Sequence, residues 1–236
     1  MDSILFIFII RIASILQTST GFGFSILATP FLLLLFAPNE AIQINLILSL
    51  LISLMLFQKI KQDVNTAIVL RFIIGSSVGL FLGISIFLFL TVGTLKLTVS
   101  IIILVLTFLL ILRFRMQQHP KRDLFVGAIS GTLTTSIGMP GPPLLLYFSG
   151  TDTNKAVLRG TTLAFYLYIY VVSLCIQVIF AGTSWTVWKA SGVAIPLVIL
   201  GMFVGQYLFK WMNQRAFQLF TYGLLIFTGI YLAIYH

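Results

Sequence analysis

Three prolines and two glycines interrupt an apolar stretch in the second half of the chain. Residues 131–147 read Gly-Thr-Leu-Thr-Thr-Ser-Ile-Gly-Met-Pro-Gly-Pro-Pro-Leu-Leu-Leu-Tyr. Proline lacks the backbone N–H and clashes with the preceding turn, so no continuous helix runs through this segment. In lipid, a broken backbone is tolerated only where it is buried in protein or lines a water-filled cavity. The segment therefore indicates either a site inside a membrane or a loop at its surface, and we favour the site.

The composition places most of the chain in a membrane. Hydrophobic residues make up 59% of the sequence and charged residues only 8%, which is about a third of the usual charged fraction. The net charge of +9 comes from Lys and Arg in short connections, which suits anionic lipid headgroups rather than nucleic acid. Cys175 is the single cysteine, so we expect no internal disulfide and no cysteine-based metal site. His119 and His236 are isolated, and we expect no other metal site and no cofactor. The five acidic residues are all expected at segment ends or in loops: Asp2, Glu40, Asp63, Asp123 and Asp152.

Apolar segments of membrane-spanning length recur along the chain. About 20 residues are needed to cross a core of ~30 Å at 1.5 Å per residue. Two apolar segments, 24–36 and 144–149, are too short to cross. Each is therefore predicted to form a re-entrant hairpin with the segment before it, over residues 3–36 and 124–149. The predicted spans are residues 41–58, 66–90, 94–112, 157–181, 186–208 and 215–235.

The order of these segments predicts an all-α polytopic membrane protein with an internal repeat. Residues 1–115 and 120–236 each contain a broken-helix hairpin followed by three transmembrane helices. Aligning Pro30 with Pro143 matches Pro-Phe-Leu-Leu-Leu-Leu-Phe with Pro-Leu-Leu-Leu-Tyr-Phe. Because three is an odd number of spans, the second repeat enters the membrane from the opposite side. Inverted repeats with discontinuous helices are a common plan of secondary transporters.

The basic residues predict an orientation in the cell membrane. Most Lys and Arg residues fall on one side of this topology, and the positive-inside rule makes that side cytoplasmic. Both termini are then extracytoplasmic, and the loop over residues 113–122 is cytoplasmic. Arg71 is expected to contact lipid headgroups. One helix face is expected to pack against another helix, because it carries Gly75, Gly79 and Gly83. Four amide side chains are expected to hydrogen-bond between helices: Gln43, Asn45, Gln177 and Gln206.

Several short motifs carry a resemblance to a known family. Gly138-Met-Pro-Gly-Pro-Pro-Leu-Leu-Leu-Tyr147 resembles the Gly-x-Gly-Gly-Pro-Pro-Leu-x-Leu-Tyr stretch of the TauE/SafE sulfite-exporter family. Val157-Leu-Arg-Gly-Thr161 is similar to that family's Arg-Ala-Thr segment, and Gly21-Phe-Gly23 through Pro30 looks like a degraded form of its glycine-rich stretch. The resemblance implies a transporter of small sulfur-containing anions such as sulfite or organosulfonates. Pro140 replaces a glycine of the family pattern, and Phe24-Ser25 stands where further glycines are usual, which leaves the substrate open.

The two predicted hairpin tips supply the candidate substrate-binding groups. Each tip combines hydroxyl side chains with glycines that let a ligand approach backbone N–H groups, and the helix that starts there directs its positive end inward. A single Ser or Thr in a membrane helix usually bonds its own backbone, but two such clusters favour a site. Arg11 has lipid contact as an equal alternative, whereas the family resemblance favours Arg159. The candidate residues are Thr20, Gly21, Gly23, Ser25, Thr135, Ser136, Gly138, Gly141, Arg11 and Arg159.

The predicted activity is secondary transport by alternating access around the two tips. A passive anion channel or facilitator, or a transporter of another small organic anion, remains open. An intramembrane enzyme is not expected, because no paired acids, Ser–His pair, Ser–Lys pair or metal ligands fall at membrane depth. A non-transporting scaffold subunit is a further alternative. The expected partners are a small anionic substrate and membrane lipids, with homodimerisation left open and no nucleic acid.

Overall fold

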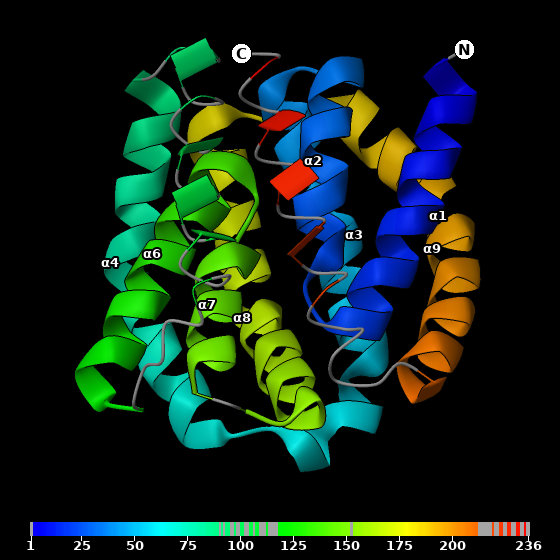
Figure 1. Cartoon of the computed structure of the whole chain (residues 1–236). Helices are drawn as coiled ribbons and strands as arrows, with labels where there is room; N and C mark the ends of the chain where they lie inside the picture. Colours follow the sequence, from blue (N-terminus) through cyan, green and yellow to red (C-terminus); the bar gives the residue numbers. More distant parts are fainter. Residues whose placement is uncertain are drawn as a thin grey trace.

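The described part of the chain is helical throughout, apart from short connections (Figure 1). The computed structural model describes residues 2–89, 118–151 and 153–211, together with scattered positions between 91 and 112 and between 219 and 234. An all-α fold is therefore confirmed for these residues, whereas the predicted spans 94–112 and 215–235 lie largely outside them. The elements are α1 Asp2–Thr20, α2 Gly23–Leu35, α3 Pro38–Ile60, η1 Lys61–Asp63, α4 Thr66–Phe89, α6 Pro120–Ile137, α7 Gly141–Gly150, α8 Lys155–Ala181 and α9 Trp185–Trp211.

Four helices in the described ranges are long and apolar enough to cross a membrane. They are Pro38–Asp63, Thr66–Phe89, Lys155–Ala181 and Trp185–Trp211. These four coincide with the predicted spans that begin at residues 41, 66, 157 and 186. Ile4–Thr20 and Gly23–Leu35 are apolar but shorter, as expected for the arms of a hairpin.

Tight turns at two glycines interrupt the predicted hairpins. Gly21 (φ 93°) separates α1 from α2, and Gly138 (φ 75°) ends α6 before α7 begins. Positive φ values are costly for residues with a Cβ, which explains glycine at both turns. Gly138 also closes α6, because its N–H bonds the carbonyls of Leu133 and Thr134. Pro142 then lies in the first turn of α7, where its missing N–H leaves no bond unmade.

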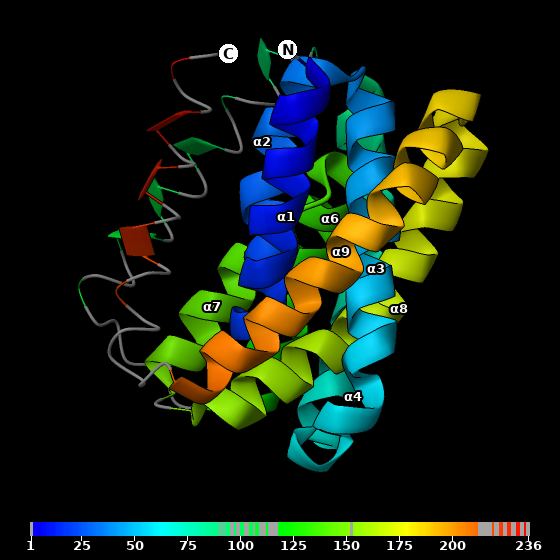
Figure 2. The same ribbon diagram turned by 90° about the vertical axis from the view of Figure 1, so that its right-hand side faces the viewer.

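The helices α3 and α8 form the centre of the bundle. They pack against each other, and each contacts an arm of a hairpin: α3 contacts α1 and α2, and α8 contacts α6. In Figure 1 both lie between α4 and α6 on one side and α1 and α9 on the other, and in Figure 2 α9 crosses α3 obliquely. The largest buried side chains also belong to this region, including Phe24, Tyr147, Tyr166 and Tyr170. The central pair is therefore placed to hold both hairpin turns.

Glycine faces of two spanning helices hold the first arms of the hairpins. Added Cβ atoms at Gly75, Gly79 and Gly83 of α4 would overlap the backbone of α6, so the predicted role of these glycines in helix packing is confirmed. In α9, Gly201 and Gly205 make the same kind of close contact with α1. Each first arm thus packs against a helix from the other half of the chain.

One expectation about a charged residue needs correction, and a second charged residue is more buried than its position suggests. Nη1 of Arg71 lies 2.9 Å from Oδ2 of Asp123, so Arg71 forms an ion pair rather than a simple lipid contact. The Asp123 side chain is fully buried, although it lies only one turn into α6. The Asp123 side chain is covered because α6 packs closely on α4 and because α7, the next helix, packs against α6. Asp152 lies outside the described residues.

Candidate functional site

The N-terminal ends of α2 and α7 meet inside the bundle. A Cβ at Gly141, the first residue of α7, would lie 3.2 Å from the Ile26 Cδ1 atom of α2 and 3.2 Å from the Tyr166 hydroxyl. Neither helix has a side-chain cap: the N-cap residues are Phe22 and Pro140. Helix N-termini carry partial positive charge, so two uncapped ends at one place suit an anion.

Amide side chains fix both hairpins to the central helices. Asn45 of α3 donates to the Gly138 carbonyl at 2.7 Å, and Gln177 of α8 donates to the carbonyl of Thr135. Gln17 of α1 donates to the Ser49 carbonyl of α3 at 3.0 Å. The predicted role of Asn45 and Gln177 in bonding between helices is thereby confirmed. Gln43, which bonds the Gly182 carbonyl, and Gln206, which accepts from Lys59, also fulfil that prediction.

Arg159 brings a buried positive charge to the first turn. A Cβ at Gly21 would lie 3.1 Å from the Cα atom of Arg159. The Arg159 side chain is only 8% exposed, and its Nε has no hydrogen-bond partner in the described part of the chain. Its guanidinium carbon lies 4.2 Å from the centre of the Phe209 ring, and Asp63 adds an attractive charge. The hydrogen-bonding capacity of this guanidinium is incompletely used, which suits a ligand-binding role.

Most hydroxyl groups at the turns bond their own helix. Thr20 donates to the Leu16 carbonyl and Ser136 to the Thr132 carbonyl, both at 2.7 Å. Thr135 donates to Gly131 and also lies 3.3 Å from the Ser173 hydroxyl. Such bonds are the ordinary state of Ser and Thr in helices. These three hydroxyls therefore retain acceptor lone pairs, whereas their donor capacity is already used.

The comparison with known families covers the turns and the apolar helices alike. The family model described as sulfite exporter TauE/SafE matches residues 6–232, nearly the whole chain. The chain belongs to this family. No curated protein and no solved structure matches it. Members of the TauE/SafE family are transporters and not enzymes, and with the long apolar helices this makes the chain a multi-pass membrane transport protein.

The candidate residues of this TauE/SafE protein divide into two groups. The turn glycines, the hydroxyl residues and Arg159 lie buried near the two turns, the hydroxyl residues being Thr20, Ser25, Thr135 and Ser136. Arg11 lies elsewhere: its side chain is exposed, and ten residues of helix separate it from Gly21, which is roughly 15 Å. The structure therefore does not bring Arg11 to the first turn.

Two features of the site were missed from the sequence. Tyr170 of α8 lies beside Ser25 of α2 and Ser49 of α3, and Tyr166 of α8 lies beside Tyr170 and Gly141. The four-residue spacing of the tyrosines on a predicted span places both on one helix face, and this pattern could have identified them. The register of the two turns was also missed. Placing Gly21 on Gly138 aligns Thr18-Ser19 with Thr135-Ser136, about one helical turn away from the alignment of Pro30 with Pro143.

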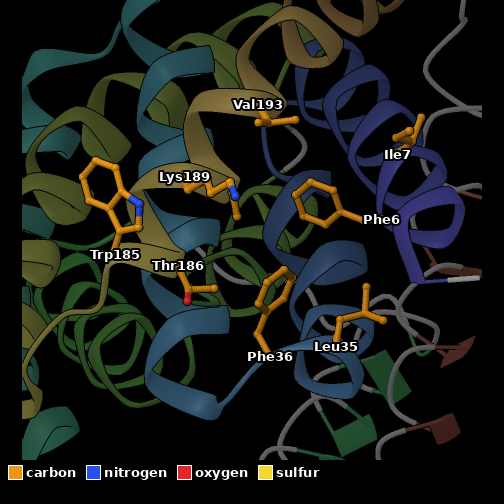
Figure 3. Close-up of a pocket in the computed structure, with 9 residues that line it drawn as sticks. Phe6, Ile7, Leu35, Phe36, Trp185, Thr186, Lys189 and Val193 are labelled. Atoms are coloured by element: carbon orange, nitrogen blue, oxygen red, sulfur yellow. The ribbon is translucent and has the colours of Figure 1, made fainter.

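A pocket elsewhere in the TauE/SafE protein does not involve the turns. It has a volume of about 570 Å³ and lies between the start of α1, the end of α2 and the start of α9 (Figure 3). Its walls are mainly apolar, with Phe6 and Phe36 edge to face at 5.7 Å between ring centres. Lys189 adds a positive charge. Because the pocket is at the opposite end of α1 and α2 from Gly21, it is separate from the candidate site.

Proposed function

We propose that this protein is a secondary transporter that exports small sulfur-containing anions, such as sulfite or an organosulfonate, by alternating access around its two hairpin turns. The observation that carries the proposal is the meeting of the uncapped N-terminal ends of α2 and α7 in a buried region. Discontinuous helices whose N-termini face an anionic substrate are a recurring transporter device. Family membership supports the same class of substrate.

The proposed ligands are backbone and hydroxyl groups near the two turns. Arg159 is the proposed positive charge, because it is buried and lies against Gly21. We assign Arg11 no direct contact, since its side chain is exposed. Neutral donors supply the remaining contacts, which suits a carrier because it must also release its substrate. The proposed contact residues are Thr20, Gly21, Gly23, Ser25, Thr135, Ser136, Gly138 and Gly141. The hydroxyls of Thr20, Thr135 and Ser136 and the N–H groups of Gly21 and Gly138 would donate to the anion only after they release their bonds to their own helices.

An inverted repeat over residues 1–115 and 120–236 is part of the proposal. Two packing relations support it: α1 packs on α9 as α6 packs on α4, and α3 contacts α9 as α8 contacts α4. In Figure 1, α1 runs downward from the N-terminus, whereas α6 runs upward from the lower end of the bundle. Opposite directions are expected of equivalent helices in inverted repeats, which place two related gates on opposite sides of one site.

The proposed orientation places both termini outside the cell membrane. The ends of α3 and α9 and the starts of α6 and α8 lie at the lower end of the bundle in Figure 1. Basic residues accompany these ends, namely Lys59, Lys121, Lys155 and Lys210. By the positive-inside rule this end is cytoplasmic. Tag labelling in intact cells should reach either terminus but not a tag in the loop before Lys121, and the opposite result would reverse the orientation.

Reconstitution of the purified protein in liposomes tests the function. Sulfite and an alkylsulfonate, compared with sulfate and acetate, should show saturable flux that is accelerated by substrate on the opposite side. Empty liposomes provide the baseline for leakage. Flux that does not saturate would identify a channel instead, and absence of flux for every anion would contradict the proposal.

A further inference from the structure

Four hydroxyl groups gather where the N-terminal ends of α2 and α7 meet. Ser25 comes from α2, Ser49 from α3, and Tyr166 and Tyr170 from α8, and all four are fully buried. The Tyr170 hydroxyl interacts with the other three, and the tyrosine ring centres are 4.7 Å apart. The Tyr166 hydroxyl also borders Gly141, so the cluster reaches the start of α7. We call these four residues the hydroxyl cluster.

The described residues offer the hydroxyl cluster few hydrogen-bond partners. None of its four oxygens has a hydrogen-bond partner of normal distance and angle among the described residues. Buried polar groups in native proteins rarely lack partners, because the loss of water is then uncompensated. The four hydroxyls approach one another around Tyr170, but these contacts leave hydrogen-bonding capacity for a further molecule at this point.

The surrounding charges favour an anion as that partner. The described acids with placed side chains are engaged elsewhere: Glu40 accepts from Ser184, Asp123 pairs with Arg71, and Asp63 lies against Gly160. The cluster itself offers hydroxyl donors, and the ends of α2 and α7 add partial positive charge. A cation would find no full negative charge among these groups.

We infer that Ser25, Ser49, Tyr166 and Tyr170 form the selectivity centre of the carrier and bind the oxygen atoms of a small oxyanion through neutral hydroxyl donors. This inference rests on the proposed transport function. Hydroxyls from three helices can each donate a hydrogen bond to a different oxygen of one anion. The centre therefore prefers an anion with three or more oxygens to chloride, which offers a single acceptor atom.

Tyrosine-to-phenylalanine variants test the inference with little change of volume. Tyr166→Phe and Tyr170→Phe each remove one hydroxyl of the cluster. Tyr168→Phe is the matched control, because Tyr168 lies between them on α8 but on another face, where it is only partly buried. With radiolabelled sulfite in proteoliposomes, each cluster variant should raise the apparent KM by about 10- to 100-fold, as expected for one hydrogen bond to a charged group. Tyr168→Phe should leave the KM unchanged.

Thermal unfolding separates this role from a structural one. Because the Tyr170 hydroxyl has no normal hydrogen bond, Tyr170→Phe should leave the Tm of the ligand-free protein unchanged or raise it. Added sulfite should raise the Tm of the parent protein more than that of the variant, since only binding to the folded state stabilises. A lowered Tm with an unchanged KM would show that the hydroxyls are structural and would overturn the inference.

The outcomes distinguish the inference from the function on which it rests. If the parent protein transports sulfite and both cluster variants behave like Tyr168→Phe, the inference alone is wrong. Ser25→Ala and Ser49→Ala give an independent check, with the exposed Ser77→Ala of α4 as their control. If the parent protein neither transports nor is stabilised by any tested anion, the proposed function fails and the inference fails with it.

Discussion

The side-chain amide of Asn45 donates a hydrogen bond of 2.7 Å to the carbonyl oxygen of Gly138, the residue at which α6 ends. This bond joins the middle of α3 to the turn of the second hairpin, which is 93 residues away in the sequence. Because α3 also accepts the Gln17 amide of the first hairpin at Ser49, one helix fixes the positions of both hairpins. A substitution in α3 that removes these hydrogen bonds should therefore alter the positions of both turns.

Replacement of Asn45 by Ala should destabilise the protein. It removes the donor to a buried carbonyl, and a buried group left without a partner costs about 1–3 kcal/mol. The measurement is the free energy of unfolding in detergent, together with the maximal transport rate. Gln206→Ala is the control, because it removes an amide from an exposed bond to Lys59. Equal effects of the two substitutions would show that the Asn45 bond has no special role.

The turn at Gly21 should tolerate a side chain less well than another glycine with a positive φ. Gly21 and Gly182 have φ values of 93° and 72°, so Ala is strained at both positions by about 1–3 kcal/mol. A Cβ at Gly21 would also press on Arg159 at 3.1 Å, whereas nothing lies within 4 Å of one at Gly182. Gly21→Ala should therefore lower both the Tm and sulfite affinity, and Gly182→Ala should lower only the Tm. The same loss of affinity in both variants would exclude a local effect at the turn.

Much of the architecture follows from the sequence, because its determinants are local. Prolines at 140, 142 and 143 break a helix wherever they occur, and the length of an apolar segment decides whether it can cross a bilayer. The break that these prolines predict thus appears as a turn at Gly138 between α6 and α7. The glycine face of α4 was also predictable, since its four-residue spacing is visible in the sequence.

The composition of the site depends on contacts that no local pattern contains. Tyr166 and Ser49 resemble ordinary residues of spanning helices until α3 and α8 bring them beside the start of α2. The burial of Asp123 likewise depends on α4, which lies more than 30 residues earlier in the chain. Only the family resemblance favoured Arg159 over Arg11, because the exposure of each side chain is decided by which helix face the neighbouring helices cover.

The Arg71–Asp123 pair should respond asymmetrically to substitution. Removing one member of a buried ion pair costs about 3–5 kcal/mol, because a buried charge is left behind. Asp123 is fully buried but Arg71 is 40% exposed, so Arg71 can regain water and Asp123 cannot. Arg71→Met should therefore lower the free energy of unfolding more than Asp123→Asn. The double variant Arg71→Met/Asp123→Asn should recover most of the loss caused by Arg71→Met, and an additive loss would exclude coupling between the two residues.

The two arginines offered as charges for the anion should differ sharply in their effects on affinity. Arg159 is buried against Gly21 with Nε unpartnered in the described structure, whereas Arg11 is exposed on α1. If Arg159 binds the substrate, Arg159→Gln should raise the apparent KM for sulfite at least tenfold, since a hydrogen bond between charged groups contributes about 1.5–3 kcal/mol. Arg159→Lys should recover part of that affinity, because it keeps the charge but loses the planar set of donors. Arg11→Gln, the control, should leave the KM unchanged. The reverse order, with Arg11→Gln more damaging than Arg159→Gln, would move the charged contact to α1 and away from the first turn.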